Sequence, residues 1–398
     1  MDLREVPVDQ LTFGMYVSKL DRPWTETPFV FQGFVLKNER QLGALKQYCK
    51  SVFVDPEKEE RRDAIKVTPA EIALVRGNTV YKQVAPVEAE MPRAEKAFTN
   101  TTSVVKEISR VVEGSSTIDS SRSREAAAQI TDSVVRNPDA MALLTKLQEK
   151  GGATLSRAVE VSVLMTIFGR FLQLPPDRLQ VLGMLGLLQD VGKLKLPTDL
   201  AARGPRTEEE VELYQSHVNH SVRILSDTAG VPAEIPALAS LHHERYDGSG
   251  YPRGLKGNAI AQFGHIAGIV DTFDTLTAPA PLGAGMPPSN ALNVLYKGRG
   301  REYHPALVEQ FIQCVGVYPI GSIVELNSGE VAVVIAQNMV RRMQPRIMIV
   351  KDAKGNPIQP YKMLDLMKEP KCRPDEPYRI VRSLGYEAVR IDPRELFL

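Results

Sequence analysis

The chain has 398 residues, of which 43% are hydrophobic and 24% charged, a composition typical of a soluble globular protein with two or three domains. Lys and Arg number 49 against 48 Asp and Glu, so the net charge of +1 gives no global reason to expect a nucleic-acid polymer or an anionic membrane as partner. The ordinary counts of 28 Gly and 28 Pro exclude collagen-like and wholly disordered chains.

The cysteines and the apolar runs predict the compartment. Cys49, Cys314 and Cys372 are far apart and follow no metal-binding spacing, so we expect a reducing environment without a disulfide framework. The first ten residues contain acids and lack the apolar core of a signal peptide. The apolar run 181–188 is far too short to cross a bilayer. We therefore predict a cytoplasmic protein without a membrane span.

Residues 1–60 are predicted to form a small α+β module. Residues 15–17 are strand-like, residues 39–49 carry apolar side chains at helical spacing, and residues 51–54 again favour a strand. Further short apolar runs lie at 28–31 and 33–36. Frequent charges and prolines then predict a linker over 61–91, with a short helix near 70–75.

The rest of the chain divides into a helical and a β region. Apolar residues recur at helical spacing over 92–315, which predicts an all-α bundle with strongly apolar helices at 156–174 and 178–189. Apolar runs at 320–326, 331–335 and 346–350, separated by turn residues, predict a small β-meander or barrel within 316–398, followed by a tail. The expected fold class is therefore multidomain α+β.

The histidines predict a metal site. Five of the six lie between residues 217 and 265, and aspartates flank them. Imidazole and carboxylate together suit Fe, Mn or Zn, and a bundle core can bring such ligands together from several helices. Chance clustering of surface histidines is the plain alternative. His242 and His243 would point about 100° apart on a helix. The pair would therefore serve two neighbouring ions, or one ion at a helix end.

Several motifs carry a resemblance to a known family. An apolar helix ends in Asp190-Val191-Gly192-Lys193, and His242-His243-Glu244 leads into the loop Asp247-Gly248-Ser249-Gly250-Tyr251-Pro252. With Gly254-Leu255-Lys256-Gly257 and Asp271-Thr272-Phe273-Asp274, these motifs make residues of about 150–315 resemble the HD-GYP domain, a subgroup of the HD superfamily of metal-dependent phosphohydrolases. Residues 3–60 resemble the uncharacterised module often found ahead of such domains.

The resemblance implies a bacterial signalling protein whose active relatives hydrolyse cyclic di-GMP. It implies catalytic roles for Asp190 and Lys193, with Lys193 on a phosphate oxygen. The implied metal ligands are Asp190, His217, His242, His243 and Asp271. The implied ligand-binding residues are Lys193, Gly250, Tyr251 and Pro252. His220, His265 and His304 match no ligand position, and Asp274 is expected to stabilise its helix or support a ligand rather than to bind metal.

Two positions depart from the family's pattern. Gln189 stands in place of the namesake histidine, and Arg157 in place of an upstream His or Glu ligand. An amide is a weak ligand, and an arginine cannot ligate but places a fixed positive charge where a metal would otherwise sit. By resemblance these two positions serve one ion, together with Asp190 and Asp271. The other ion is implied to be held by Asp190, His217, His242 and His243. We therefore expect one Fe or Mn ion, or none, rather than two.

A third departure concerns the nucleotide. After Asp274 the family usually has a basic, aromatic stretch that meets phosphates, whereas residues 278–283 carry no charge. Losing two charge-assisted contacts would lower the affinity by about 10–100-fold apiece.

Two functions stay open at this point. The first is a metal-dependent phosphodiesterase that cleaves cyclic di-GMP to the linear dinucleotide or GMP, with a hydroxide between two metals as the nucleophile. The second is a degenerate protein that senses cyclic di-GMP weakly or regulates partners such as diguanylate cyclases, with a homodimer as a candidate assembly. Gln189 and Arg157 favour the second, so we predict a signalling protein with impaired or absent hydrolysis.

Overall fold

The computed structural model describes residues 3–13, 15–27, 29, 33–36, 39–55, 67–114, 118–147, 153–197, 200, 206–278, 285–338, 341 and 343–384. The chain divides into two compact units, the first combining residues 1–66 with 316–384 and the second built on residues 67–315. The finer boundaries drawn from the sequence stay a prediction. Among the described residues, no helix is both long and apolar enough to span a membrane.

The N-terminal part of the first unit is a four-stranded sheet with one helix. Its strands β1 (Arg4–Pro7), β2 (Tyr16–Leu20), β3 (Phe34–Val35) and β4 (Ser51–Val54) are antiparallel in the order β1-β4-β2-β3, and helix α1 spans Glu39–Tyr48. Short 3-10 turns cover Val8–Gln10 and Trp24–Glu26. Val17, Leu36 and Leu45 are buried in its core. The α+β module is thereby confirmed, while the apolar run at 28–31 lies, except for Phe29, outside the described residues.

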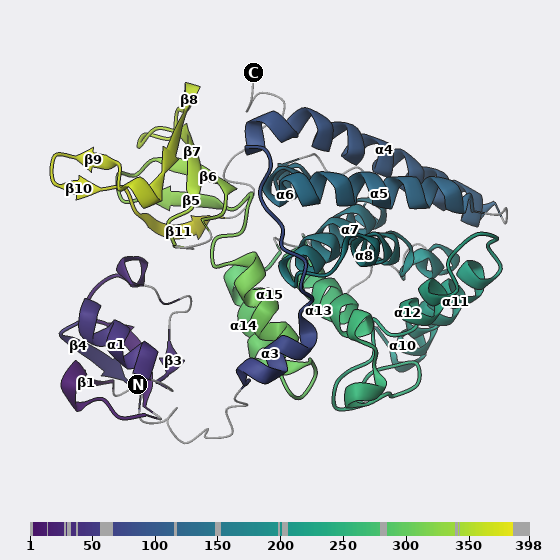
Figure 1. The fold of residues 1–398 in the computed structure, drawn as a ribbon, viewed down its shortest axis with the longest axis horizontal. Helices are drawn as coiled ribbons and strands as arrows, with labels where there is room; N and C mark the ends of the chain where they lie inside the picture. Colours follow the sequence, from purple (N-terminus) through teal and green to yellow (C-terminus); the bar gives the residue numbers. More distant parts are fainter. Residues whose placement is uncertain are drawn as a thin grey trace. The chain divides into compact units, whose positions relative to one another are not determined.

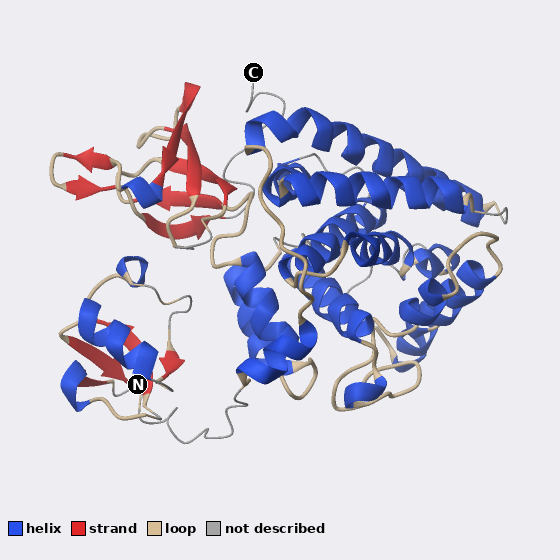
Figure 2. Cartoon of the chain, viewed as in Figure 1, coloured by secondary structure: helices blue, strands red, loops and turns tan. Residues whose placement is uncertain are grey.

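The C-terminal part of the first unit is a five-stranded antiparallel sheet, drawn in red in Figure 2. Its strands are β5 (Ile323–Leu326), β6 (Val331–Ala336), β7 (Arg346–Lys351), β8 (Pro357–Asp365) and β11 (Ile380–Leu384), in the order β11-β5-β6-β7-β8. Strands β9 (Lys371–Arg373) and β10 (Glu376–Pro377) pair separately, and a 3-10 turn covers Leu366–Lys368. Because β8 and β11 remain edge strands in the described region, the sheet is an open meander rather than a barrel.

The second unit is the predicted helical bundle (Figure 1). Its helices are α3 (Pro69–Val75), α4 (Val87–Glu113), α5 (Ser120–Arg136), α6 (Pro138–Leu147), α7 (Ala153–Phe171), α8 (Pro176–Leu188), α10 (Glu208–Gln215), α11 (His217–Ser226), α12 (Glu234–Ala239), α13 (Gln262–Thr277), α14 (Pro288–Gly298) and α15 (Pro305–Val315). The described part of this unit also contains the 3-10 turns η3 (Val191–Lys195) and η4 (Gly257–Ala259).

Helices α7 and α8 form the centre of the bundle. Both are apolar on most sides, which is the pattern of a helix buried all round, and α4, α5 and α13 pack around them. Gly186 permits their close approach, because a Cβ at this position would lie 2.5 Å from Ser162 Cα. The site described below is therefore built on the ends of rigid, buried helices.

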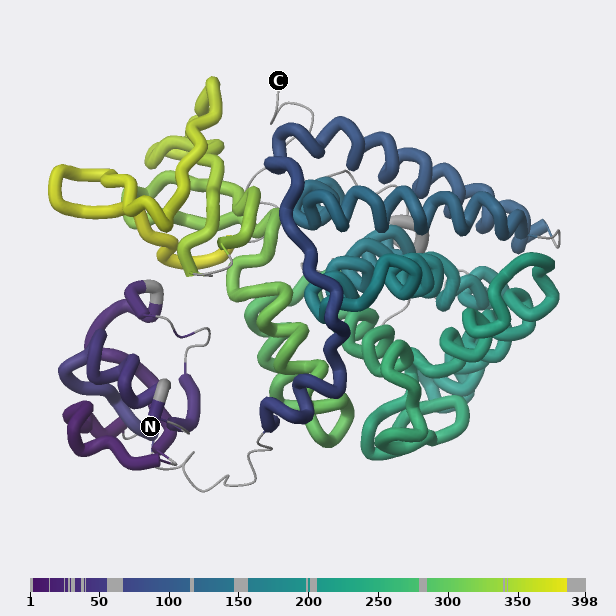
Figure 3. Tube along the Cα trace, viewed as in Figure 1, coloured from purple at the N-terminus to yellow at the C-terminus, as the bar shows by residue number. Residues whose placement is uncertain are grey.

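Helix α4 begins at Val87. Pro86 supplies an extended residue before α4, and Glu88 and Glu90 in its first turn favour the helix start at Val87. Before it, the short helix predicted near 70–75 is present as α3. The segment between α3 and α4 then runs extended along the helices (Figure 3), with Gly77 N donating to Leu172 O at 2.8 Å.

Candidate metal centre

Four side chains gather at one point of the helical unit. Asp190, His217, His242 and His243 each place one potential ligand atom within 4.8 Å of the others. The Nε2 atom of His242 lies 3.3 Å from Asp190 Oδ1, and that of His217 lies 3.5 Å from the same oxygen. The structure thus brings together four of the five predicted metal ligands.

These side chains come from the ends of three helices. Asp190 follows α8 and His217 opens α11, while His242 and His243 lie in the turn after α12. In this turn the two histidine rings lie with centroids 4.1 Å apart. Because the pair lies in a turn rather than within a helix, both rings reach one centre. This geometry resembles the second arrangement considered from the sequence, in which both histidines face one ion at a helix end.

Backbone carbonyls orient two of the rings. His217 Nδ1 lies 2.6 Å from Tyr214 O, and His242 Nδ1 lies 2.7 Å from Ala239 O. A proton on each Nδ1 donates to that carbonyl and leaves the lone pair of Nε2 facing the centre, as in metal-binding histidines.

The atoms that face the centre are buried without hydrogen-bond partners. This holds for Asp190 Oδ1 and for the Nε2 atoms of His217, His242 and His243 within the described structure. Buried polar atoms are normally paired, so a converging set of unpaired acceptors is typical of a cation-binding site. One carboxylate and three imidazoles suit Fe, Mn or Zn. These residues therefore fit a divalent metal ion.

The protonation states at the centre also suit ligation. Burial lowers the pKa of His217, and burial together with nearby positive charge lowers that of His243 well below its usual range. Burial alone would raise the pKa of Asp190, but Lys193, whose Nζ lies 2.6 Å from Oδ2, and the neighbouring histidines hold it well below its usual range. Near neutral pH these two imidazoles are uncharged and the carboxylate is ionised.

Gly192 allows the Asp190 turn to approach α11. Its N–H donates to Ser221 Oγ at 2.8 Å, and a Cβ on Gly192 would lie 2.0 Å from His217 O and 2.5 Å from Ser221 N.

We expect Gly192→Ala to lower the free energy of unfolding by about 1–3 kcal/mol and to reduce metal content, because the turn must move away from His217. Urea denaturation and metal analysis test this. Gly43→Ala, at a helical position with open space, is the control. Equal stability of Gly192→Ala and the parent would contradict it.

The glycine-rich loop is anchored beside the centre. Glu244 accepts hydrogen bonds from Arg253 N at 2.9 Å and Leu255 N at 2.8 Å, and Tyr251 N donates to His243 O. The Tyr251 ring stacks on His243 with centroids 4.7 Å apart. Tyr251, with Gly250 and Pro252 on either side of it, is therefore held next to the metal-binding set. Our sequence reasoning gave Glu244 no role, although a carboxylate directly before this loop was an available signal.

The fifth predicted ligand, Asp271, is outside the four-residue set. Arg157 on α7 reaches α13, where its Nε lies 2.8 Å from Asp274 Oδ2 and its Nη2 lies 3.5 Å from Asp271 Oδ1. The same Nη2 donates to Thr275 Oγ1 at 2.6 Å. Burial alone would lower the pKa of Arg157, but the aspartates raise it, so the guanidinium stays charged. Asp271 and Asp274 are thus the ion-pair partners of an arginine.

Gln189 is buried at the end of α8. Gln189 is 1% exposed, and neither its Oε1 nor its Nε2 has a hydrogen-bond partner within the described structure. The uncharged stretch 278–283 lies, except for Ala278, outside the described residues.

Two further histidines form a separate pair. The rings of His265 and His304 have centroids 5.2 Å apart, and Tyr246 contacts both. Neither belongs to the metal-binding set, and neither does His220 on α11.

This histidine pair predicts a pH-dependent stability. Burial, with a smaller effect of His304, lowers the pKa of His265 to about 4. The unfolded chain therefore binds the proton first, and stability falls as the pH drops from about 6.5 toward 4. We expect the protonation of His265 to lower the free energy of unfolding by about 1–2 kcal/mol between pH 7 and pH 5. Denaturation of metal-free protein at both pH values should show a smaller loss for His265→Asn than for the parent or the control His220→Asn. Equal losses in all three would contradict the prediction.

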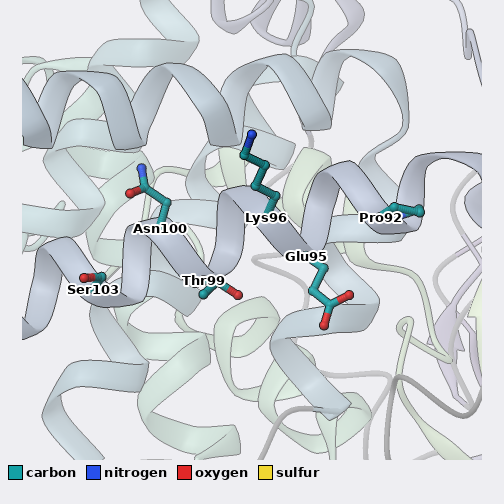
Figure 4. A pocket seen from close by; sticks show the side chains of 6 residues that line it. All are labelled: Pro92, Glu95, Lys96, Thr99, Asn100 and Ser103. Carbon is teal, nitrogen blue, oxygen red and sulfur yellow. The ribbon is translucent and has the colours of Figure 1, made fainter.

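A surface depression of about 540 Å³ lies on α4 (Figure 4), and none of the ligating residues lines it. It is lined by Pro92, Glu95, Lys96, Thr99, Asn100 and Ser103. This lining contains no histidine and only one carboxylate, so it does not resemble the metal-binding set.

Comparisons with known proteins agree with the order of the parts. Residues 139–307 match the HD domain, residues 3–122 match a domain of unknown function, and residues 323–373 match a KOW domain associated with the HD domain. The four-residue set and Arg157 all lie within the stretch that matches the HD domain.

Similar proteins include two that are named cyclic di-GMP phosphodiesterases. The chain is 29% identical to the cyclic di-GMP phosphodiesterase PA4108 of Pseudomonas aeruginosa over 371 residues, 92% of this chain and 89% of that protein. It is 31% identical over 173 residues to the cyclic di-GMP phosphodiesterase response regulator RpfG of Xanthomonas campestris, covering 43% of this chain and 46% of that protein. Bd1817, an HDG"Y"P protein of Bdellovibrio bacteriovorus, superposes with a TM-score of 0.47 at 16% identity, over 78% of this chain and 98% of that one.

Proposed function

The chain belongs to the HD-GYP family, and from this premise we propose that it is a cyclic di-GMP signalling protein that binds one metal ion and hydrolyses the nucleotide slowly or not at all. The observation that carries this proposal is the ion pair of Arg157 with Asp271 and Asp274. It places a protein cation 3.5 Å from Asp271, a carboxylate that a second metal would need.

The proposed metal ion is held by Asp190, His217, His242 and His243, the set whose facing atoms are buried and unpaired. When bound, such an ion polarises a phosphoryl oxygen and lowers the pKa of bound water. Lys193, paired with Asp190, is the cation available to a phosphate oxygen, and Tyr251 stacks on His243. We propose Fe or Mn as the resident ion.

Charge favours a single ion. Asp190, Asp271 and Asp274 supply three negative charges, which Arg157 and Lys193 reduce to one. One divalent cation turns this into a single positive charge, which suits one phosphodiester group. A second divalent cation would have to displace Arg157 or lie beside its fixed charge in a site of low dielectric constant.

Gln189 supports the same proposal. Its position directly before Asp190 leaves a buried amide where an imidazole would bind a metal more strongly. Without two ions, water is a poorer nucleophile because one cation lowers its pKa less than two do. We propose that the protein, located in the cytoplasm, acts as a cyclic di-GMP sensor or as a regulator of signalling proteins such as diguanylate cyclases.

The test is a measurement of metal content together with hydrolysis. The full chain, purified without oxygen, is expected to contain one Fe or Mn per chain by mass spectrometry and to convert cyclic di-GMP slowly or not at all. Two ions per chain with sustained turnover would overturn the proposal.

That second outcome would support the alternative function, an active cyclic di-GMP phosphodiesterase. The complete four-ligand set with Lys193 beside it favours this alternative, as do the relatives named as phosphodiesterases.

A further inference from the structure

We propose that Arg206 and Tyr214 form a guanine-binding subsite at the edge of the metal centre. The inference rests on the proposed function, because it specifies which part of cyclic di-GMP these residues contact. Arg206 precedes Thr207, the N-cap residue of α10, and Tyr214 lies in the last turn of this helix.

Tyr214 connects the subsite to the metal-binding set. Its carbonyl oxygen lies 2.6 Å from His217 Nδ1, and its ring centroid lies 5.1 Å from that of His217. Lys193 Nζ, which pairs with Asp190, lies 5.8 Å from the Tyr214 ring centroid. The ring is therefore a direct neighbour of both a metal ligand and the phosphate-binding lysine.

Arg206 is held against this ring. Its Cζ lies 3.9 Å from the Tyr214 ring centroid, a close cation–π contact. The capping box of Thr207 and Glu210 fixes the start of α10 immediately after it. The guanidinium is thus oriented before any ligand arrives, which lowers the entropy that binding costs.

The donors of Arg206 are largely unused. Nη2 donates to Leu200 O at 3.0 Å, while Nε is buried without a hydrogen-bond partner in the described part of the chain. No carboxylate of a described residue forms an ion pair with it. The free N–H groups of Nη1 and Nη2 can donate two parallel hydrogen bonds to guanine O6 and N7. Adenine offers an amino group where guanine has O6, so this arrangement selects guanine.

The test compares two cyclic dinucleotides by calorimetry on the full chain in the presence of Mn²⁺. Arg206→Ala is expected to weaken cyclic di-GMP binding by about 10–100-fold and to leave cyclic di-AMP binding unchanged. Arg206→Lys should bind cyclic di-GMP little better than Arg206→Ala does, because lysine keeps the charge but lacks the planar guanidinium with its paired donors. Tyr214→Leu should weaken cyclic di-GMP binding by removing the support of Arg206. Arg223→Ala, whose side chain is 84% exposed on α11, is the matched control.

The outcomes separate this subsite from the proposed function. If the parent protein binds cyclic di-GMP and Arg206→Ala binds it equally well, the subsite is wrong and the proposed function stands. Equal weakening of both dinucleotides would assign Arg206 to a phosphate and overturn guanine recognition. If the parent binds no cyclic di-GMP, both proposals fail. Unchanged metal content in Arg206→Ala shows that the centre is intact.

Discussion

Replacing Asp190 with alanine is expected to remove the bound metal ion and any hydrolysis of cyclic di-GMP together. Asp190 is the carboxylate of the four-residue set, and one of its oxygens faces both His217 and His242. Without it, imidazoles face the positive charge of Lys193 with no anion to offset the incoming cation. We expect metal affinity to fall by at least about 100-fold, since even supporting residues of a metal site contribute 10–100-fold.

Metal analysis of protein purified without oxygen measures this effect. Asp190→Ala also leaves the buried Lys193 unpaired, which destabilises the fold, so Asp190→Asn serves as a second variant of similar shape. Asp227→Ala, a 76% exposed carboxylate at the end of α11, is the control. We expect Asp271→Ala to retain its ion, since Asp271 pairs with Arg157. Full metal content in both Asp190 variants would refute the assignment of the centre.

The sequence predicts the larger elements well because they depend on local patterns. Helix α1, strand β4 and the apolar helices α7 and α8 follow from spacing alone. The choice between a meander and a barrel depends on whether the edge strands β8 and β11 meet, which no local pattern encodes.

The site divides in the same way. The resemblance to the HD-GYP family implied that His217, His242 and His243 are ligands. The sharing of one centre by the adjacent histidines depends on a turn after α12. The fixed charge of Arg157 was predictable from its residue type. Its partners Asp274 and Thr275 required the packing of α7 on α13, which joins residues more than a hundred positions apart. The contact of Arg206 with Tyr214 likewise depends on the course of the chain into α10.

The role of Arg157 predicts that the second metal site can be restored. Arg157→His combined with Gln189→His removes the fixed charge from Asp271 and Asp274 and supplies two imidazoles. We expect metal content to rise from one ion to two per chain. Hydrolysis of cyclic di-GMP should rise by at least about 100-fold, the range that a positioned acid–base or metal contribution supplies.

The two single variants and a control histidine placed on an exposed face separate the contributions of Arg157 and Gln189 to metal binding. Arg157→His alone should release the two aspartates without completing the site, and Gln189→His alone should leave Arg157 in place, so each is expected to stay near one ion. Arg223→His adds a histidine on the exposed face of α11 and controls for adventitious binding. A double variant that still binds one ion would contradict the role given to Arg157. A double variant that binds two ions and stays inert would show that missing ligands do not limit hydrolysis. The limit would then lie in nucleotide contacts, for which the uncharged stretch 278–283 is the first place to restore a cation.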